Sequence, residues 1–333
     1  MDKFLHYSSF ADHLEVIARC PRIEAELWCD PEPCEGDFCA AIDCGITEPG
    51  INLLAQLGCH MRFHSGWQSS IFPTAICLIC PVLIVASDEP NLSKEQMRQF
   101  LLTAKVVASR HTSEGITQPW RLTLSDGTLT HDAHFETVDE HKPNMQFAGG
   151  RTELNFVDSY KYDIAGYALA ELLGLDDMVP MYVPRKWQGT SGALSWWVPV
   201  MMNEKQRAAK KVAVPDPDAW NNQMYKIRVF DELIYETDAN LTNVLIGPDW
   251  KIWRIDFSRA FRQNKDLRNP KNLIRCDRNL FDKLKALNGN ELAQKTKGYV
   301  DQSQVQAVMA RRDKIVRYFQ KLIADKGENE VLY

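Results

Sequence analysis

The sequence predicts an α+β protein in which a strand-rich first half precedes a helical second half. Apolar residues alternate with polar ones on both sides of Asp126-Gly127, which indicates a β-hairpin at 119–138. Apolar residues at helical spacing indicate a helix at 160–173 that ends at Gly174. Three more helical patterns occupy the last third of the chain, at 217–235, 278–289 and 303–325.

Shorter elements are predicted between these landmarks. A capping-box pattern at 93–96 marks the start of another helix. An extended segment at 178–183 and a strand at 193–200 follow the helix at 160–173, and Gly189 and Gly192 supply the turn between them. The first half of the chain is therefore predicted to be rich in strands, before the helical end.

Composition and cysteine usage exclude some function classes. The 333 residues carry 39 basic and 44 acidic side chains, a net charge of -5, which gives no basis for nucleic-acid binding or a polybasic membrane patch. Six of the nine cysteines lie in the first 60 residues, at spacings unlike a zinc knuckle. The one CxxC pair, Cys77 and Cys80, is embedded in an apolar run. A zinc module is therefore disfavoured.

Residues 61–86 have the three parts of a secretory signal. A short basic segment precedes the apolar run 71–86, which ends at Ala86 before a polar stretch. Pro73 and Pro81 argue against a buried helix. We expect cleavage near Ala86 and regard residues 1–60 as an upstream extension. A membrane anchor at 71–86 is the open alternative, and both place the rest of the chain outside the cytoplasm, as a periplasmic, secreted or membrane-anchored protein.

The densest chemical signal lies at 235–257. Asp238 and Asn243 are five residues apart on a loop that leaves a helix, and a short hairpin then leads to Asp256. The hairpin is expected to bring Asn243 beside Asp256, so that an amide and a carboxylate converge as ligands for a hard divalent cation. Asp238 is placed to accept or orient the proton of an attacking hydroxyl. The alternative is that Asp238 and Asn243 only form Asx turns.

The order D-x4-N, hairpin and Asp256-Phe257 resembles the catalytic and metal-binding loops of the protein-kinase-like superfamily. The similarity is to the branch that holds phosphatidylinositol 3-/4-kinases, HipA-type kinases and Golgi casein kinase type enzymes. The helix at 162–175 with Val179-Pro180 resembles that branch as well. The resemblance implies a two-lobed domain at 92–325, with an N-lobe at about 92–202 and a C-lobe at about 203–325.

The resemblance also implies residue roles. Asp238 is the catalytic aspartate, and Asn243 and Asp256 are ligands of Mg²⁺ or Mn²⁺. Asp163 takes the place of the helix carboxylate that pairs with a phosphate-binding lysine. These four residues are the candidate site.

ATP is the implied nucleotide, and its adenine is expected on the backbone between Val198 and Met202. The lysine that the family carries after its alternating strand is missing, because Glu136 follows Ala-His-Phe there. Lys142 and Arg121 are candidate replacements. The loss of a lysine at the phosphates weakens the contact that positions ATP.

Two functions from different classes remain. One is an ATP- and magnesium-dependent phosphotransferase acting on a hydroxyl of a protein, a lipid or a small molecule, with possible membrane association through 71–86. The other is an extracytoplasmic pseudokinase, or a module that binds a nucleotide or a partner with little or no transfer. The missing lysine favours the second function, and the matched loops favour the first.

Overall fold

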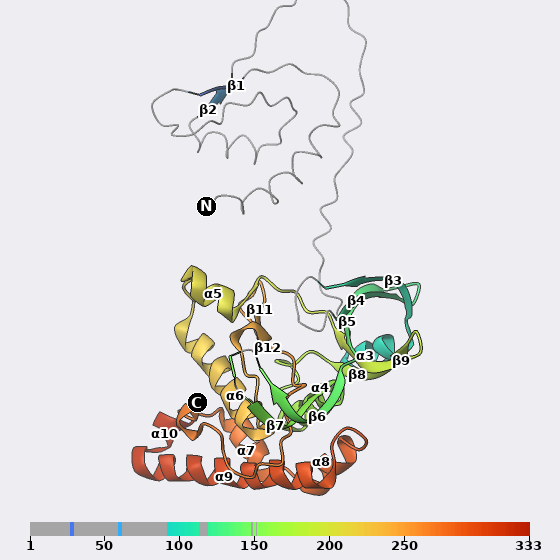
Figure 1. The fold of residues 1–333 in the computed structure, drawn as a ribbon. Helices are drawn as coiled ribbons and strands as arrows, with labels where there is room; N and C mark the ends of the chain where they lie inside the picture. Colours follow the sequence, from blue (N-terminus) through green and yellow to red (C-terminus); the bar gives the residue numbers. More distant parts are fainter. Residues whose placement is uncertain (1–26, 30–58, 62–91, 113–118, 148, 151) are drawn as a thin grey trace, which may run out of the picture. The chain divides into compact units, whose positions relative to one another are not determined.

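The structure, a computed structural model, divides into two units, Met1–Ala86 and Ser87–Tyr333. It describes residues 27–29, 59–61, 92–112, 119–147, 149–150 and 152–333. In the first unit, β1 (Leu27–Cys29) pairs antiparallel with β2 (Cys59–Met61). The predicted signal segment at 71–86 and most of the predicted extension lie outside the described residues. All other elements belong to the second unit (Figure 1).

Five antiparallel strands form the main sheet of the second unit. The order across the sheet is β3 (Lys105–His111), β4 (Trp120–Ser125), β5 (Thr130–Glu136), β9 (Thr190–Trp196) and β8 (Tyr182–Trp187). The Asp126 carboxylate accepts the backbone N–H groups of Thr128 and Leu129 at 2.8 Å and closes the predicted β4–β5 turn. The hairpin predicted at 119–138 is confirmed.

Two details of the predicted strands differ. The predicted strand at 193–200 is β9, which begins at Thr190 and ends at Trp196. The β8–β9 turn lies at Gln188 and Gly189, and Gly192 is inside β9, paired with Arg185. The edge strand β3 is not predicted, because its mostly exposed side chains follow no apolar alternation.

The helix α3 (Lys94–Thr103) covers one face of this sheet. Its predicted capping box is present, between Ser93 and Gln96. Phe100 is buried and packs against Trp196 of β9, with ring centroids 5.8 Å apart. The apolar residues of β4, β5 and β9 on this face are buried in the core, among them Leu122, Leu124, Ala133, Phe135 and Leu194.

The opposite face of the sheet carries polar side chains. Register places Arg121, His134, Ser195 and Tyr182 in one row across β4, β5, β9 and β8. Residues directly opposite one another in antiparallel strands project from the same face. The row ends at Tyr182, whose hydroxyl lies 3.5 Å from the backbone nitrogen of Asp256. This polar face therefore leads to the candidate site.

The helix α4 (Tyr160–Leu173) has the predicted bounds and ends at Gly174, which is left-handed with φ of 66°. Its close approach to the candidate site depends on Gly166. A Cβ at this position would lie 2.7 Å from Cδ2 of Phe257. Only glycine allows this spacing, so α4 carries Asp163 directly to the Asp256-Phe257 turn.

A polar hairpin, β6 (Asp139–Gln146) and β7 (Thr152–Ser159), is inserted between β5 and α4. The sequence does not predict it, because β6 reads DEHKPNMQ and its side chains are almost all exposed. Phe156 of β7 is buried, and the guanidinium of Arg259 lies 4.4 Å from its ring centroid. This contact holds the hairpin to the C-terminal half.

Helices dominate the C-terminal half (Figure 1). They are α5 (Glu204–Lys210), α6 (Pro217–Ile234), α7 (Arg278–Ala286), α8 (Gly289–Lys295), α9 (Gln302–Lys326) and α10 (Glu328–Val331). The helix predicted at 278–289 is α7, which ends at Ala286, and α8 begins at Gly289 as a separate helix because Asn288 caps it through the N–H groups of Asn290 and Glu291.

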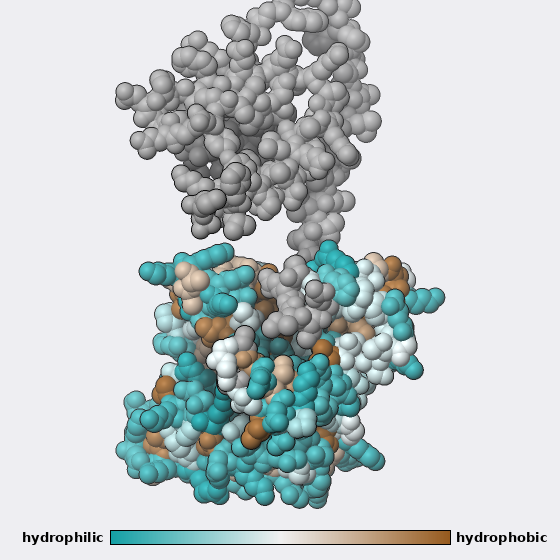
Figure 2. All heavy atoms as spheres, viewed as in Figure 1, coloured by the Kyte–Doolittle hydropathy of each residue, from teal (hydrophilic) through white to brown (hydrophobic). Residues whose placement is uncertain are grey.

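A small sheet of β10 (Met202–Asn203), β11 (Val244–Ile246) and β12 (Ile252–Arg254) carries the candidate site. Within the described ranges, no helix is long and apolar enough to span a membrane. Hydrophilic side chains cover most of the described face in Figure 2, and hydrophobic ones form small separate patches.

Candidate active site

The site begins where α6 ends. Tyr235 is left-handed, with φ of 56°, and turns the chain out of the helix. Glu236 is 1% exposed, and its Oε1 accepts the backbone N–H of Asp238 at 2.7 Å. The Asp238 side chain is exposed and has no hydrogen bond or ion pair within the described part of the chain. A buried acid thus fixes the backbone of Asp238 and leaves its carboxylate available.

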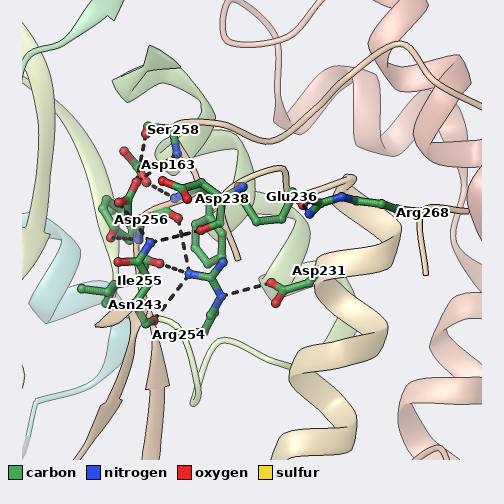
Figure 3. Close-up of polar contacts among 12 residues, drawn as sticks. Asp163, Asp231, Glu236, Asp238, Asn243, Arg254, Ile255, Asp256, Ser258 and Arg268 are labelled. Carbon is green, nitrogen blue, oxygen red and sulfur yellow. Dashed lines mark hydrogen bonds and ion pairs between the residues drawn. The ribbon is translucent and has the colours of Figure 1, made fainter. Parts of the chain in front are cut away.

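Asn243 joins the two loops of the site. It ends the short 3₁₀ helix η1 (Leu241–Asn243), whose cap Asn240 accepts the N–H of Thr242 at 2.9 Å. The Nδ2 of Asn243 lies 3.2 Å from Oδ2 of Asp256 and 3.5 Å from the backbone oxygen of Asp238. The expected convergence of Asn243 and Asp256 is therefore present (Figure 3).

Asp256 lies in a tight turn after β12. Its backbone is left-handed, with φ of 62°, a conformation that aspartate tolerates better than most residues. The hydroxyl of Ser258 donates to Oδ1 of Asp256 at 2.9 Å. The backbone N–H of Ile255 donates to the backbone oxygen of Asn243 at 3.0 Å. The hairpin β11–β12 sets this position, because Val244 pairs with Arg254.

The buried Arg254 supports both loops of the site, and no sequence motif identifies it as a site residue. It is 1% exposed, and its Nε donates to Oδ1 of Asp231 at 3.1 Å. Its Nη1 contacts the backbone oxygens of Ile255, Asn243 and Asp256, the last two at 3.4 Å. Burial lowers the pKa of Arg254, but the carboxylates of Asp231, Glu236 and Asp256 together outweigh this effect and raise it. The guanidinium stays charged and ties both loops to α6.

Carboxylates gather beside Asp256. Asp163 is 3% exposed, and its Oδ1 accepts the N–H of Phe257 at 2.7 Å. Burial, and then the charge of Asp256, raise the pKa of Asp163 well above its usual range. Burial also raises the pKa of Asp158, and the charges of Asp256 and Glu136 add to this effect. Within the described ranges, Asp158, Asp163 and Asp256 form no ion pair.

The clustered carboxylates suit a divalent cation, because its positive charge would balance their negative charge. Oxygen ligands from carboxylates and an amide suit Mg²⁺ and Mn²⁺. Asp256 offers a carboxylate. Asn243 donates from Nδ2 to that carboxylate at 3.2 Å, and half a turn of its amide would present the amide oxygen to the same cation. A bound cation would also relieve the repulsion that raises the pKa of Asp163. The donor set therefore fits a divalent cation, although no group of three or more acidic, histidine or cysteine ligands occurs in the described part of the chain.

The sheet side of the site holds His134. Burial lowers the pKa of His134, although the nearby Glu136 and Asp256 oppose this effect. Neutral histidine supplies no positive charge to the site. Glu136 accepts the N–H groups of Thr137 at 2.7 Å and Val138 at 2.9 Å, so it anchors the start of the inserted hairpin.

The two candidate replacements for the missing lysine are not brought to Asp163. The Nζ of Lys142 lies on the exposed hairpin, 2.7 Å from Oε2 of Glu140. The Nε of Arg121 lies 2.6 Å from Oδ2 of Asp132, and its guanidinium lies 4.0 Å from the ring centroid of Trp197. Both cations are engaged elsewhere, so the phosphate-contacting role predicted for them lacks structural support.

The predicted adenine segment connects the main sheet to β10. Val198 is buried, and Met202 pairs with Ile246 of β11. The N–H of Met201 donates to the Ile246 oxygen at 2.8 Å. The segment thus links the two halves directly beside the site-bearing sheet, and its contact with adenine stays a prediction.

These features define a protein-kinase-like fold: a β-rich N-terminal region with the helices α3 and α4 packed on it, a helical C-terminal part, and a loop–hairpin site between them. Two solved structures of the Golgi casein kinase have this fold. One is 13% identical and covers 72% of this chain and 80% of that chain, with a TM-score of 0.51. The other, with Mn/ADP bound, is 11% identical and covers 72% and 78%, with a TM-score of 0.52.

A proinflammatory kinase of Helicobacter pylori, CtkA, is also similar at 8% identity and a TM-score of 0.44, over 67% of this chain and 97% of that chain. No family model matches the sequence, and no curated protein matches it. At these identities the two structures of the Golgi casein kinase show the fold alone.

Proposed function

We propose that this protein is an ATP- and divalent-metal-dependent phosphotransferase that acts on a hydroxyl group. One observation carries the proposal: the Asn243 amide contacts both Asp256 and the backbone of Asp238. The Asn243 side-chain nitrogen thus joins the carboxylate of Asp256 to the backbone of Asp238, and these are the two other residues chosen from sequence spacing. The Mn/ADP complex of the Golgi casein kinase, which has the same fold, supports the choice of nucleotide and metal.

Each residue has a distinct task in the proposed reaction. Asp256 and Asn243 would hold the cation, which neutralises charge on the transferred phosphate. The available carboxylate of Asp238 orients the acceptor hydroxyl and takes its proton. Arg254 positions both loops without touching the substrate, because its donors face backbone oxygens and Asp231.

A pseudokinase is the second candidate, and Asp163 favours it. The resemblance implies that Asp163 pairs with a lysine. Within the described ranges, however, Asp163 forms no ion pair and accepts only the N–H of Phe257. Without a basic side chain beside Asp163, the nucleotide phosphates lose a charge contact. The alternative function is therefore nucleotide or partner binding with little transfer.

The decisive experiment separates binding from chemistry. ATP with Mg²⁺ is expected to raise the melting temperature of the protein, and Asp256→Ala is expected to abolish this shift. Asp238→Ala is expected to keep the shift and to lose phosphate transfer. Asp325→Ala, at an exposed position of α9, is the matched control and should change neither. A nucleotide shift with no transfer by the unaltered protein would support the pseudokinase.

We also propose an extracytoplasmic address, supported by the signal-like composition of residues 61–86. Amino-terminal sequencing of the protein recovered from its natural source tests this proposal. A mature chain that begins near Ser87 is expected. Recovery of a chain that retains residues 61–86 in the cytoplasmic fraction would contradict it.

A further inference from the structure

The inserted hairpin of β6 and β7 runs beside the segment that follows the candidate metal ligand Asp256. The backbone N–H of Ser159, at the end of β7, donates to the backbone oxygen of Ser258 at 2.9 Å. The guanidinium of Arg262 donates to the backbone oxygen of Asn155, also on β7, at 2.9 Å. The beginning and the end of this short segment therefore contact the same strand.

Little apolar packing holds the hairpin in this place. In its two strands, Phe156 is the one buried apolar side chain, and it lies outside the main core cluster. A cavity of about 840 Å³ borders β7, and Glu153, Val157, Ser159 and Arg262 help to line it. That side of β7 therefore lacks a packed interior, and polar contacts must attach the hairpin to the C-terminal half.

Glu153 provides the strongest of these polar contacts, because its one carboxylate pairs with two guanidinium groups. Its Oε2 lies 2.6 Å from Nη2 of Arg259, and its Oε1 lies 2.6 Å from Nη2 of Arg262. The Arg259 side chain is 9% exposed and the Glu153 side chain is 19% exposed, so salt and water screen this pair weakly. Hydrogen bonds between charged groups are about twice as strong as neutral ones.

Arg259 depends on Glu153 for its position. Its guanidinium lies 4.4 Å from the ring centroid of Phe156 and 5.5 Å from that of Phe147, both on the hairpin. Its buried Nε has no hydrogen-bond partner in the described part of the chain. Within the described ranges, Glu153 is the one carboxylate that forms an ion pair with Arg259. Loss of the Glu153 charge would leave a buried cation without its counter-ion.

The backbone around Arg259 connects to both loops of the candidate site. The Arg259 oxygen accepts the hydroxyl of Thr237 at 2.9 Å, and Thr237 directly precedes Asp238. Ser258 directly precedes Arg259, and its hydroxyl donates to Oδ1 of Asp256 at 2.9 Å. A displacement of Arg259 would therefore shift both the residue that is proposed to take the proton and the residue that is proposed to hold the cation.

The base of the hairpin is fixed independently of Glu153. The Oδ1 of Asp139, at the start of β6, accepts the hydroxyl of Ser159 at 2.7 Å, and its Oδ2 accepts Nζ of Lys161 at 2.7 Å. These bonds close the base of the hairpin at the start of α4. Glu153 lies near the other end of β7, so it controls the free part of the hairpin while the base stays in place.

We propose that the inserted hairpin clamps the active site, and that Glu153 is a positioning residue that sets Asp256 and Asp238 through Arg259. The inference rests on the proposed phosphotransferase function and deepens it. Glu153 touches neither the nucleotide nor the cation; it keeps the metal-binding and proton-accepting residues in their places for transfer. Residues that orient metal ligands in this indirect way contribute about 10–100-fold to metal affinity or activity.

Hydrogen exchange of the full chain, followed by mass spectrometry, tests the clamp without any nucleotide. Glu153→Gln is expected to speed exchange about tenfold in the peptides that contain the amides of Asp238 and Phe257, because the bonds that hold these loops open more often. Glu171→Gln is the matched control and should leave these peptides unchanged. Glu171 also bridges two cations, Arg98 and Lys295, and its side chain is 22% exposed, but it lies about two turns of α4 beyond the candidate site.

The Mg²⁺ dependence of ATP binding supplies the second readout. Glu153→Gln is expected to raise the Mg²⁺ concentration for a half-maximal ATP shift about tenfold and to lower kcat, and Glu171→Gln is expected to change neither. A merely structural role would lower the melting temperature and leave the Mg²⁺ dependence unchanged. Glu153→Asp keeps the charge but is too short to reach both guanidinium groups. It should change both readouts in the same direction by a smaller factor, and it replaces Glu153→Gln if that variant does not fold.

The two readouts separate this inference from the proposed function. Faster exchange at Asp238 and Phe257, with no Mg²⁺-dependent ATP shift by the unaltered protein, would support the clamp and contradict the phosphotransferase. Unchanged exchange in Glu153→Gln, or an equal effect of Glu171→Gln, would overturn the clamp. So would an ATP shift whose Mg²⁺ dependence is the same in Glu153→Gln and in the unaltered protein.

Discussion

The buried guanidinium of Arg254 lies 3.1 Å from the carboxylate of Asp231, and this one pair links α6 to both loops of the candidate site. Burial raises the pKa of Asp231, and the charge of Arg254 opposes that rise. The position of Asn243 and Asp256 therefore depends on this pair.

Arg254→Met should destabilise the protein strongly. The substitution leaves Asp231 without its cation and removes the donors to three backbone oxygens, and loss of one partner of a buried pair costs about 3–5 kcal/mol. Urea denaturation measures this loss. Arg317→Met, at an exposed position of α9, is the control and should change the free energy of unfolding little. Equal stability of the two variants would contradict the supporting role of Arg254.

Asp256→Asn should abolish the Mg²⁺-dependent ATP shift without lowering the melting temperature of the protein alone. The amide keeps an oxygen for the Ser258 hydroxyl and removes the charge that raises the pKa of Asp163. The new NH2 group replaces the Asp256 oxygen that now accepts from Asn243, and half a turn of the Asn243 amide restores that hydrogen bond with the roles reversed. Differential scanning fluorimetry with and without Mg²⁺ and ATP measures both effects. A retained shift would place the cation elsewhere.

Glu236 should make the stability of the protein fall as the pH rises. Burial raises its pKa from 4.5 to about 8, so the native state holds a proton that the unfolded state has released between these values. The stability that this proton provides is present below about pH 4.5 and lost as the pH rises through 8. The effect is on the order of 2–5 kcal/mol.

Glu236→Gln tests this pH dependence. Glutamine keeps an oxygen for the N–H of Asp238 but does not titrate. The variant should gain stability relative to the unaltered protein between pH 5 and pH 9, in urea titrations at each pH. Glu330→Gln, at an exposed position, is the control and should show no such trend. A constant difference between Glu236→Gln and the unaltered protein across this range would count against the raised pKa.

Glu136→Lys should strengthen nucleotide binding. Glu136 occupies the sequence position where the resembling family carries lysine, and its charge contributes to the raised pKa of Asp163. A lysine would reverse that contribution, and we expect ATP to bind about tenfold more tightly. Glu140→Lys on the exposed strand β6 is the control. Equal or weaker ATP binding by Glu136→Lys would show that position 136 does not face the phosphates.

Gly166→Ala should destabilise the protein by about 1–3 kcal/mol, the usual cost of overpacking. The new methyl group would meet Phe257 at 2.7 Å, so the Asp256-Phe257 turn must shift. Alanine favours helix, and the measured loss is therefore net of a helix gain of up to about 1 kcal/mol. Urea denaturation gives the loss, and the ATP shift reports the displaced turn. A stabilised variant would contradict the tight contact.

The parts of the fold that the sequence predicts are those marked by local sequence patterns. The helix from Tyr160 to Leu173, the β4–β5 hairpin and the contact between Asn243 and Asp256 follow from periodicity, caps and turn residues. β3 and β6 could not be found in this way, because their exposed side chains do not alternate. Their strands are defined by pairing with neighbours rather than by their own sequence.

Long-range contacts explain what the sequence misses at the site. Arg254 lies in a short strand next to Asp256, and nothing in that spacing shows that Asp231, on the preceding helix, neutralises it. Lys142 follows the expected lysine position closely in sequence, but the inserted hairpin carries it away to Glu140. Adjacency in the sequence therefore overestimates adjacency in space wherever an insertion intervenes.

The register of strand β7 matters because its two faces have different neighbours. Val157 and Ser159 line the cavity, and Asp158 interacts with Ser258. A strand alternates its side chains with a period of two, so insertion of one residue between Thr152 and Val157 would exchange its faces. Asp158 would then point into the cavity that Val157 and Ser159 line, and Val157 would face Ser258 and Asp256. Changes of length during evolution should thus be confined to the tip of the hairpin.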